Sequence, residues 1–379
     1  MSIVDFLVVG GGIAGASMAA ELSGSASVLL LEAEAQPNYH STGRSAAIFF
    51  EMYGKPPVRA LSRASKPLFF HPPGDFADAP LVGARGALYI ANKEQLERLE
   101  AFAGQPDIRR FARRLSPEDA RALCPVLRPD YVAGGLEEPG AADIDVHGLH
   151  QAYLRRLKLN GGTLLTSKRV EAIRRDGDAW VVSAGAESFE GRILVNAAGA
   201  WGDEIARLAG VAPLGLEPRR RTAALVDPPA DAGPIAGWPL VIDIDEQFYF
   251  KPDAGLVLLS PADETLVEPC DIQPEEWDIA LAVDRVGKAA DIPVRHIRHS
   301  WAGLRTFSPD RVPVCGFDGV VPGFFWLVGQ GGYGVQTAPG MARLGAALAQ
   351  GAPLCDSLLA NEVDPADFSP RRLEGRRQG

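Results

Sequence analysis

Three glycines near the N-terminus are spaced so that they could bind the diphosphate of a nucleotide cofactor. Gly10, Gly12 and Gly15 form a Gly-x-Gly-x-x-Gly motif, and the acidic residue Glu32 follows further along the chain. In this motif the first glycine permits a sharp turn, the second lets the backbone approach a pyrophosphate, and the third lets a helix pack against a strand. A carboxylate at the distance of Glu32 accepts hydrogen bonds from the adenosine ribose and disfavours a 2′-phosphate. The spacing therefore predicts a dinucleotide site and argues against NADP.

The segments that must position these glycines have the pattern of a strand, a helix and a second strand. Residues 3–9 form an apolar, β-branched run that is too short for an independent helix, so we expect a buried parallel strand. We expect a helix over residues 13–22, with its N-terminus directed at the phosphates, and a second strand over residues 28–31. This order predicts a Rossmann-like domain.

Later segments favour FAD over NAD as the dinucleotide. Residues 33–47 contain small and hydroxylated side chains that would let the backbone follow a diphosphate and a flavin ring closely, although a polar loop that opens a helix is the alternative. Residues 193–201 resemble a buried strand that ends in small residues beside Trp201. Residues 323–334 predict a strand and a glycine loop that lead into a helix over residues 335–350. The N-terminus of that helix would suit the negatively charged edge of a reduced flavin.

Six separated motifs resemble the family of FAD-dependent amine and amino-acid oxidoreductases that includes D-amino acid oxidase, glycine oxidase and sarcosine oxidase. They are GIAGAS, YHSTGRSAA, VNAAGAW, YxKPDAG, WAGLR and QGGYGxQT, in this order between residues 3 and 350. The sequence is most similar to the bacterial D-amino acid dehydrogenases of the D-arginine dehydrogenase type. The resemblance implies an α/β (α+β) fold like that of D-amino acid oxidase, with a Rossmann-like FAD-binding domain and a substrate domain built on an antiparallel sheet.

The resemblance also implies non-covalent FAD, since Cys315 lies in an apolar run typical of a buried strand. His40 is interpreted as a structural or flavin-adjacent residue, and we expect no metal. The FAD-binding residues that we expect are Gly10, Gly12, Ile13, Ala14, Gly15, Glu32, Ser41, Thr42, Gly43, Arg44, Ser45, Ala46, Ala47, Val170, Ala197, Ala198, Gly199, Trp201, Gly303, Gly331, Gly332, Tyr333, Gly334, Val335 and Gln336.

Oxidation of an amino acid at its α-carbon requires that its carboxylate and amine be held in place. A carboxylate in an apolar pocket needs an arginine partner, and Arg305 matches the carboxylate-binding arginine of the family. Tyr249 would donate to the same carboxylate, and Tyr53 matches a loop position that covers the active site in relatives. The alternatives are a surface ion pair for Arg305 and core packing for Tyr249. Among the three consecutive arginines at residues 219–221, the family pattern selects Arg221 as the one that faces the pocket, and we expect the other two to be solvated.

The amine would be held by the backbone carbonyl of Gly332 and the side chain of Gln336. No carboxylate or histidine is placed as an obvious base, so we expect solvent to take the ammonium proton while flavin takes the hydride. The imine would then hydrolyse to a 2-oxo acid and ammonia. Because Arg305 and Tyr249 would recognise any α-carboxylate, glycine, sarcosine or a 2-hydroxy acid remains an alternative substrate, and a non-catalytic flavin protein is a second alternative.

The sequence departs from relatives that act on cationic D-amino acids. Those relatives are expected to carry a carboxylate at the far end of the pocket, where this chain has Ala87, and a histidine where it has Ile48. The loop over residues 48–53 is also more apolar than a cover for a polar substrate should be. We therefore expect apolar or aromatic D-amino acids to be better substrates than D-arginine, unless Glu51 supplies the absent carboxylate.

Composition limits the remaining possibilities. The chain has 379 residues, of which 46% are hydrophobic, and this describes an ordinary globular protein of about two domains. A net charge of −10 argues against a nucleic-acid partner. Four scattered cysteines and no run long enough to span a membrane predict a cytoplasmic protein. The motifs divide the chain into a discontinuous FAD-binding domain (1–80, 141–215 and 300–379) and a substrate domain (81–140 and 216–299), and we expect a quinone or another non-oxygen electron acceptor.

Overall fold

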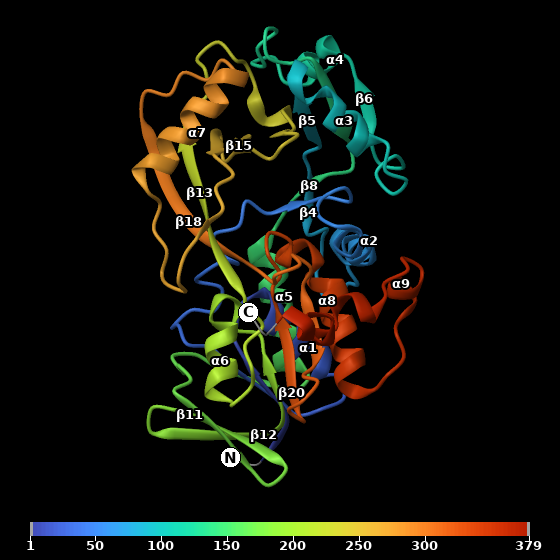
Figure 1. The fold of residues 1–379 in the computed structure, drawn as a ribbon, viewed down its shortest axis with the longest axis vertical. Coiled ribbons are helices and arrows are strands. Elements are labelled where there is room, and N and C mark those ends of the chain that lie inside the picture. Colours follow the sequence, from blue (N-terminus) through green and yellow to red (C-terminus); the bar gives the residue numbers. More distant parts are fainter. Residues whose placement is uncertain (1–2, 377–379) are drawn as a thin grey trace.

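Two large sheets lie one above the other along the long axis of the molecule, as the computed structural model of residues 3–376 shows (Figure 1). We call the part around the eight-stranded sheet the lower lobe and the part around the nine-stranded sheet the upper lobe. A three-stranded sheet of β3 (Ile48–Phe49), β4 (Val82–Ala84) and β8 (Ala142–Ile144) lies between them. The fold is therefore of the mixed α/β class.

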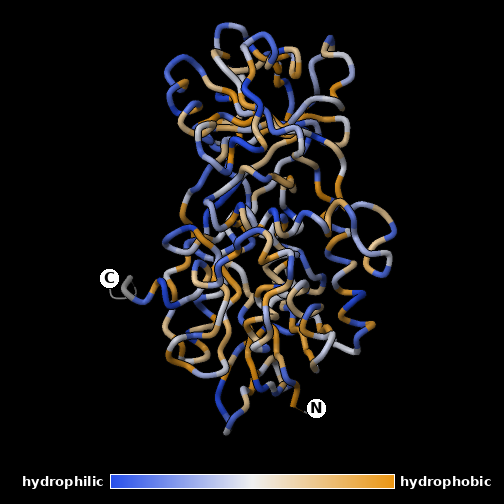
Figure 2. Tube along the Cα trace, turned by 90° about the vertical axis from the view of Figure 1, so that its right-hand side faces the viewer, coloured by the Kyte–Doolittle hydropathy of each residue, from blue (hydrophilic) through white to orange (hydrophobic). Residues whose placement is uncertain are grey.

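The lower sheet has the order β10-β11-β12-β1-β2-β9, with β20 paired to β12 and β19 paired to β20. β1, β2, β9, β12 and β20 run parallel to one another, as expected for strands that are connected through helices, whereas β10, β11 and β19 pair antiparallel with their neighbours. Its central strands are apolar along their length and buried, and Figure 2 shows hydrophobic segments concentrated inside this lobe. The strands are β1 (Val4–Val9), β2 (Val28–Leu31), β9 (Thr163–Leu165), β10 (Ala172–Asp176), β11 (Ala179–Ala184), β12 (Glu187–Asn196), β19 (Val314–Phe317) and β20 (Phe324–Val328).

Helices cover the lower sheet. The helix expected over residues 13–22 is confirmed as α1, and its small side chains let it pack against α5 and α8 in one core. The helix expected after the C-terminal glycine loop is confirmed as α8, which ends at Gly351 in a left-handed conformation (φ +65°). The helices of this lobe are α1 (Ile13–Leu22), α2 (Pro56–Phe70), α5 (Val146–Leu159), α6 (Gly202–Leu208), α8 (Gly334–Gln350) and α9 (Asp356–Leu359), with short 3₁₀ turns η2 (Gly199–Trp201), η4 (Pro365–Phe368) and η5 (Pro370–Arg376).

The upper sheet has the order β17-β13-β16-β15-β14-β5-β7-β6, with β18 paired to β13. The sequence predicted an antiparallel sheet, and this is wrong for one pair because β14 runs parallel to β5. These two strands are far apart in the chain, so no hairpin turn fixes their relative direction. The strands are β5 (Ala87–Ala91), β6 (Arg113–Leu115), β7 (Gly134–Glu138), β13 (Glu217–Val226), β14 (Leu240–Asp243), β15 (Tyr249–Asp253), β16 (Leu256–Ser260), β17 (Thr265–Leu266) and β18 (Ile297–Phe307).

Helices pack around the upper sheet. They are α3 (Leu96–Ala103), α4 (Pro117–Leu123), α7 (Glu276–Ala289) and the 3₁₀ turns η1 (Lys93–Gln95) and η3 (Ile235–Gly237). α3 ends at Ala103 because Gly104 and Pro106 interrupt the helical pattern. α4 begins after Ser116, whose hydroxyl accepts a hydrogen bond from the Asp119 amide (3.1 Å) and so caps the helix.

Strand β18 connects the two lobes and positions the site. It pairs with β13 over most of its length, so residues 300–307 lie in the upper sheet, although the proposed domain division assigns residues 300–379 to the FAD-binding domain. Its last residue, Phe307, forms a β-bridge with Gln330 of the lower lobe. Residues near the end of β18 therefore stand at the junction of the lobes. Among residues 3–376 no helix is both long enough and apolar enough to cross a membrane.

Candidate active site

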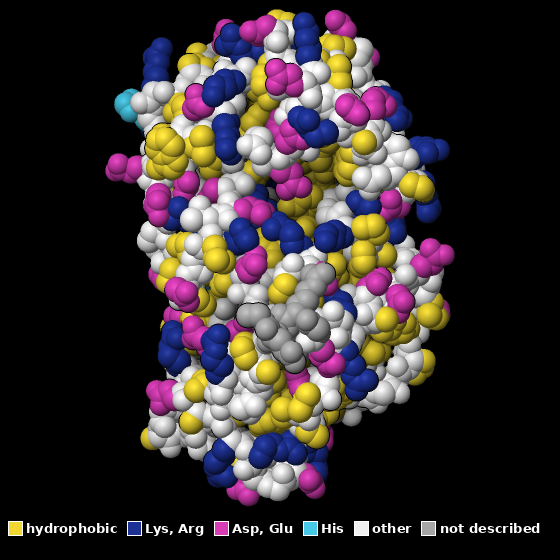
Figure 3. Space-filling model, in the orientation of Figure 1, with side chains coloured by type: hydrophobic (Ala, Val, Ile, Leu, Met, Phe, Trp, Pro, Cys, Tyr) yellow, Lys and Arg dark blue, Asp and Glu magenta, His cyan; other side chains and the backbone are white. Residues whose placement is uncertain are grey.

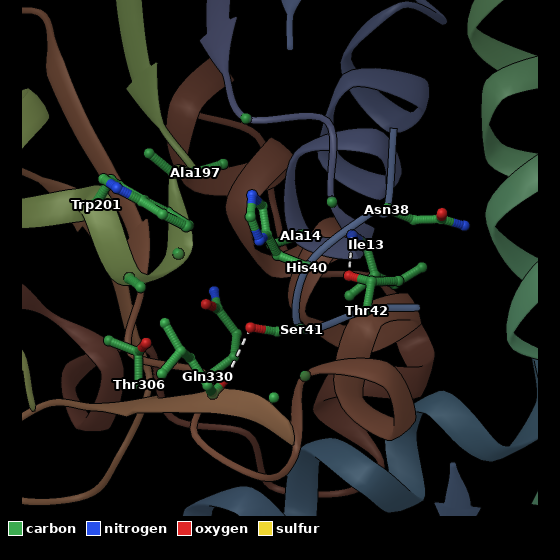
Figure 4. A pocket seen from close by; sticks show the side chains of 18 of the residues that line it. Ile13, Ala14, Asn38, His40, Ser41, Thr42, Ala197, Trp201, Thr306 and Gln330 are labelled. Carbon is green, nitrogen blue, oxygen red and sulfur yellow. Dashed lines mark hydrogen bonds between the residues drawn. The ribbon is translucent and has the colours of Figure 1, made fainter. Parts of the chain in front are cut away.

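A cavity of about 270 Å³ opens where the carboxyl ends of β1, β2 and β12 meet the loop over residues 32–47 and the end of β18. This is the edge of a parallel sheet at which ligands of α/β proteins usually bind. Figure 4 views the cavity from close by, with Trp201 next to His40 and with Thr306 and Gln330 at one end. On the outer face, Figure 3 shows a hollow with hydrophobic walls between the two lobes.

The glycine turn forms one end of this cavity. Gly10 has a left-handed conformation (φ +108°), and a Cβ atom on Gly15 would lie 1.9 Å from the carbonyl oxygen of Gly10. Only glycine permits this contact between α1 and β1. The carboxylate of Glu32 accepts a hydrogen bond from the Gly11 amide (2.7 Å). Gly11 is not one of the three glycines of the motif. The first amides of α1 have no acceptor within the helix, so this end suits a phosphate.

Two hydroxyls join the loop to its surroundings (Figure 4). The Thr42 hydroxyl accepts a hydrogen bond from the Ile13 amide at the N-terminus of α1 (3.0 Å), and the Ser41 hydroxyl donates to the Leu304 carbonyl on β18 (2.7 Å). The loop is thus fixed against both lobes. The ring of His40 lies 4.7 Å from that of Trp201, and both residues line the cavity. A residue next to the flavin is expected to line the cavity in this way.

Two buried polar atoms at the other end of the cavity have no partner among the described residues. They are the Thr306 hydroxyl and the Gln330 side-chain nitrogen, and both residues line the cavity. A buried donor without a partner is costly, so these atoms indicate that a polar ligand completes the site. A long cavity with a phosphate-binding turn, a ribose-binding carboxylate and a distant polar end fits FAD. Gln330 lies within the predicted glycine loop of residues 323–334, so its place in the site could have been predicted from the sequence. No motif in the sequence indicated Thr306.

Most of the expected FAD contacts line this cavity. They are Gly10, Gly12, Ile13, Ala14, Glu32, Ser41, Thr42, Arg44, Ser45, Ala46, Val170, Ala197, Ala198, Gly199, Trp201, Gly303, Gly331, Gly332, Gly334 and Val335. The Arg44 guanidinium, however, donates to the Ile272 carbonyl (2.9 Å) and forms an ion pair with Asp271, so its charge is already used in holding the upper lobe.

Five expected FAD contacts do not line this cavity. Gly15 packs beneath Gly10, and the Gly43 amide donates to the Asn38 carbonyl (2.9 Å) within its own turn. Ala47 and Gln336 line the neighbouring smaller cavity instead. Tyr333 packs its ring against Tyr53 (5.2 Å between centroids), because the first turn of α8 directs the tyrosine away from the glycine loop.

A smaller cavity of about 70 Å³ adjoins the first and shares Ser45, Ala46, Arg221, Tyr249, Arg305, Gly332 and Val335 with it. Arg305 donates a hydrogen bond to the Tyr53 hydroxyl (3.1 Å), and no carboxylate among residues 3–376 forms an ion pair with it. Burial lowers the pKa of Arg305, but Tyr53, Tyr249 and Glu246 together raise that pKa above the ordinary arginine value. The guanidinium is therefore always charged and available to an anion.

The tyrosines and arginines expected around Arg305 come together here. Tyr53 and Tyr249 both line the smaller cavity, and burial raises the pKa of Tyr53. Arg221 also lines it, held by the Asp263 carbonyl (2.8 Å) and the Glu264 carboxylate (3.2 Å). Arg219 and Arg220 do not reach either cavity.

The expectation that Arg220 is solvated is wrong. Its guanidinium is buried between Asp263, Glu275 and Asp278 and pairs with the last at 2.9 Å. Alternate residues of a strand face opposite sides, so Arg220 on β13 points away from the cavity that Arg221 lines.

Gly332 and Gln336 have different surroundings from those expected. A Cβ atom on Gly332 would lie 2.8 Å from the Arg305 guanidinium, so glycine leaves room for that group. The Gln336 side chain donates to the Ser62 hydroxyl (2.8 Å) and accepts from the Phe50 amide (3.3 Å). It therefore holds the loop that begins at Phe50, and its polar atoms are already partnered.

An acidic residue that sequence reasoning missed, Glu246, lines the smaller cavity. It is exposed and has a left-handed backbone (φ +54°) in the turn between β14 and β15, and no motif marks it. Glu51 does not line the cavity, because its buried carboxylate pairs with Lys66. Ala87 is fully buried in β5 and does not line it either. The remaining lining is mainly apolar, from Ile48, Phe50, Leu240, Ile242, Phe248 and Val335.

A buried histidine behind the glycine turn was also missed. His150 on α5 has its Nε2 atom 2.8 Å from the Gly11 carbonyl oxygen, and burial lowers its pKa. A neutral ring that donates from Nε2 would fix the orientation of the Gly11 peptide. The contact joins residues that are 139 positions apart, so no local pattern could have identified it.

Comparison with known proteins agrees with this geometry. Residues 5–348 match the DAO family of FAD-dependent oxidoreductases. The chain is 25% identical to the mouse FAD-dependent oxidoreductase domain-containing protein 1 over 395 residues, which covers 89% of this chain and 80% of that protein. Its fold is similar to that of glycine oxidase from Geobacillus kaustophilus (TM-score 0.80, 21% identity, 97% and 98% of the two chains). It is also similar to L-proline dehydrogenase from P. horikoshii (TM-score 0.82, 19% identity, 99% of each chain).

The chain belongs to the DAO family of FAD-dependent oxidoreductases, with the fold of that family, and its cofactor is FAD.

Proposed function

We propose that this protein oxidises D-amino acids to 2-oxo acids and ammonia. The observation that carries the proposal is Arg305, a permanently charged group without an acidic partner among residues 3–376, at the point where the FAD cavity meets a small and mostly apolar cavity. An α-carboxylate would complete its charge, and Tyr53 and Tyr249 stand beside it as further hydrogen-bond donors. The substrate α-carbon would then lie toward the FAD cavity.

In the proposed reaction the substrate ammonium first loses a proton to solvent. The α-carbon–hydrogen bond then breaks, its hydrogen leaves with both electrons, and the nitrogen lone pair forms the C=N bond. Bound FAD supplies the hydride acceptor. Water adds to the imine and releases ammonia and the 2-oxo acid. The chain contributes mainly orientation, through Arg305, Tyr249 and the Gly332 carbonyl, and no histidine among the described residues lines the smaller cavity.

We further propose that apolar or aromatic D-amino acids are preferred over D-arginine. The apolar lining of the smaller cavity and the ion pair that holds Glu51 outside it support this preference. The enantiomer and side-chain preference cannot come from the fold, because structures with this fold include a glycine oxidase and an L-proline dehydrogenase. We also propose a quinone as electron acceptor. We propose a cytoplasmic location as well, which the four free cysteines favour.

A second candidate is oxidation of another α-carboxylate, such as glycine, sarcosine or a 2-hydroxy acid. The similarity to glycine oxidase and the small size of the cavity favour it. A flavin protein without catalysis is disfavoured by the unpaired charge of Arg305, which such a protein would have no reason to bury.

The test is anaerobic mixing of the purified yellow protein with single D- and L-amino acids, glycine, sarcosine and 2-hydroxy acids while flavin absorbance is followed. Bleaching by D-phenylalanine, D-methionine or D-leucine but not by their L-enantiomers is the expected result. Faster bleaching by D-arginine would contradict the side-chain preference. Bleaching only by glycine, sarcosine or hydroxy acids would establish the second candidate. Admission of oxygen then separates an oxidase from a dehydrogenase.

A further inference from the structure

The loop that carries Tyr53 is fixed by polar contacts to the elements packed around it. We call residues 50–55, between β3 and α2, the Tyr53 loop. Its Phe50 amide donates to Gln336 (3.3 Å), and its Gly54 carbonyl accepts from Arg59 (2.7 Å). Within this loop, the Tyr53 hydroxyl accepts a hydrogen bond from Arg305 (3.1 Å). A change in the loop therefore changes the group that faces the substrate carboxylate.

The most buried contact of this loop is with Glu138, the last residue of β7 in the upper sheet. Glu138 is 1% exposed, and its carboxyl oxygen Oε1 accepts a hydrogen bond from the Glu51 amide (2.5 Å). The Met52 amide also favours the carboxylate form. Two consecutive amides before Tyr53 thus interact with one side chain from the upper sheet.

We propose that Glu138 is a positioning residue for the reaction. Its carboxyl group holds the Tyr53 loop from the side of the upper sheet and thereby keeps Tyr53 beside Arg305. The inference rests on the proposed function, because it assigns Tyr53 and Arg305 to the substrate carboxylate. No part of that function required Glu138, and no sequence motif indicated it.

The charges around Glu138 make this anchor sensitive to pH. The titratable groups that interact with Glu138 are Glu51 from the loop, Lys66 from α2 and Tyr89 from β5. Glu51 repels a charged Glu138, whereas Lys66 attracts it but already pairs with Glu51. The Glu138 Oε2 atom and the Tyr89 hydroxyl are both buried without a partner in the part of the chain that the structure describes.

Burial and, to a smaller degree, the Glu51 charge raise the pKa of Glu138 to about 8. The closed loop therefore favours the neutral acid, and by linkage ionisation favours any arrangement in which Glu138 is better hydrated. Between the ordinary carboxyl pKa and 8, a rise in pH should therefore loosen the loop and move Tyr53 away from Arg305, and above pH 8 the effect should level off. Arg305 and Tyr53 do not themselves titrate between pH 7 and 9, because their pKa values lie above their ordinary values.

The experiment measures the dissociation constant of benzoate, a simple carboxylate probe, for the FAD-loaded protein from the flavin absorbance change between pH 6 and 10. For the natural protein we expect the constant to increase between pH 6 and pH 8, by up to about tenfold per pH unit, the limit for one linked proton, and to level off above pH 8. In Glu138→Gln, which is neutral at every pH and keeps an oxygen for the amides, the constant should stay flat over the whole range and no higher than the natural value at pH 6.

The matched control is Glu137→Gln, on the same strand, where the natural side chain pairs with Arg113 at the surface and faces away from the loop. It should keep the pH dependence of the natural protein. Glu51→Gln is the second variant, and by removing the repelling charge it should move the midpoint to lower pH. This variant keeps the inference testable if Glu138→Gln fails to fold.

The same pH dependence in the natural protein and in Glu138→Gln would overturn the inference, as would a midpoint that Glu51→Gln leaves unchanged. Failure of the proposed function looks different, because benzoate would then not perturb the flavin at any pH, or would bind equally well to Arg305→Met.

Discussion

At the scale of single residues, the site is defined by one cation without a partner acid. Arg305 hydrogen bonds with Tyr53, while the other two arginines at the lobe junction, Arg44 and Arg221, already pair with Asp271 and Glu264. A substrate carboxylate therefore gains most from Arg305, because the charges of the other two are compensated.

Replacement of Arg305 tests this assignment. Arg305→Met should lower kcat/KM for the best D-amino acid by at least about 100-fold, since two charge-assisted hydrogen bonds at about 1.5–3 kcal/mol each are lost. Steady-state kinetics measure the loss, and the flavin spectrum should remain. Arg298→Met, on the exposed part of the same strand where the natural residue pairs with Asp227, is the control and should have little effect. A loss below threefold in Arg305→Met would remove Arg305 from the site.

Glu246 acts in the opposite direction to Arg305. Its exposed carboxylate lines the cavity and opposes an incoming carboxylate. Glu246→Gln should lower KM for neutral D-amino acids about 1.4- to fivefold, as expected for a screened surface charge of about 0.2–1 kcal/mol. For D-lysine the change should be smaller or reversed. Glu268→Gln, an exposed acid outside both cavities, serves as control, and an increase of KM for D-leucine in Glu246→Gln would contradict the role.

At the scale of elements, the FAD site depends on the close contact between β1 and α1. The Gly15 position lies against the Gly10 carbonyl, and the His150 ring holds the next peptide from behind. The turn is thus fixed by packing from α1 and by a hydrogen bond from α5.

A methyl group at Gly15 should displace this turn. Gly15→Ala should weaken FAD binding about 10- to 100-fold, because relief of the 1.9 Å contact costs about 1–3 kcal/mol of packing strain. Titration of the apoprotein with FAD by flavin fluorescence gives the dissociation constant. Gly24→Ala, just beyond the end of the same helix, meets its nearest atom at 3.5 Å and is the control. Equal affinities in the two variants would contradict the packing argument.

At the scale of the whole molecule, the cavity that fits FAD lies between two lobes that β18 connects. The cavity takes its walls from the lower sheet, from the loop over residues 32–47 and from the upper-sheet strands β13, β15 and β18. A ligand held by both lobes stabilises the native state by an amount that grows with the logarithm of its concentration relative to its dissociation constant.

Removal of FAD should therefore lower the thermal stability of the whole chain. A thousandfold excess of FAD over its dissociation constant contributes about 4 kcal/mol, so Tm of the apoprotein should rise by several degrees when FAD is added back. Differential scanning calorimetry measures the shift. NADP should not reproduce it, because Glu32 faces the ribose end of the site. An unchanged Tm with FAD would contradict binding between the lobes.

Local sequence was enough to predict the dinucleotide-binding turn, because that turn is built from consecutive elements. A turn, a helix and a strand that follow one another in the chain carry Gly10, Gly15 and Glu32, and each residue type has a backbone or charge requirement that local spacing expresses. The resemblance to known motifs likewise indicated Arg305, Tyr249, Tyr53 and Arg221, which the structure brings around one cavity.

The surroundings of these groups depend on contacts between distant parts of the chain. Glu246 lies in a turn, His150 on a distant helix and Glu138 at the end of a strand in the upper sheet. The contacts of His150 and Glu138 span 139 and 87 positions of the chain. Gln336 and Arg44 carry the expected residue types but use their polar atoms on other partners. Long-range pairing between the lobes fixes burial and partners, and these are properties that periodicity and motif spacing do not contain.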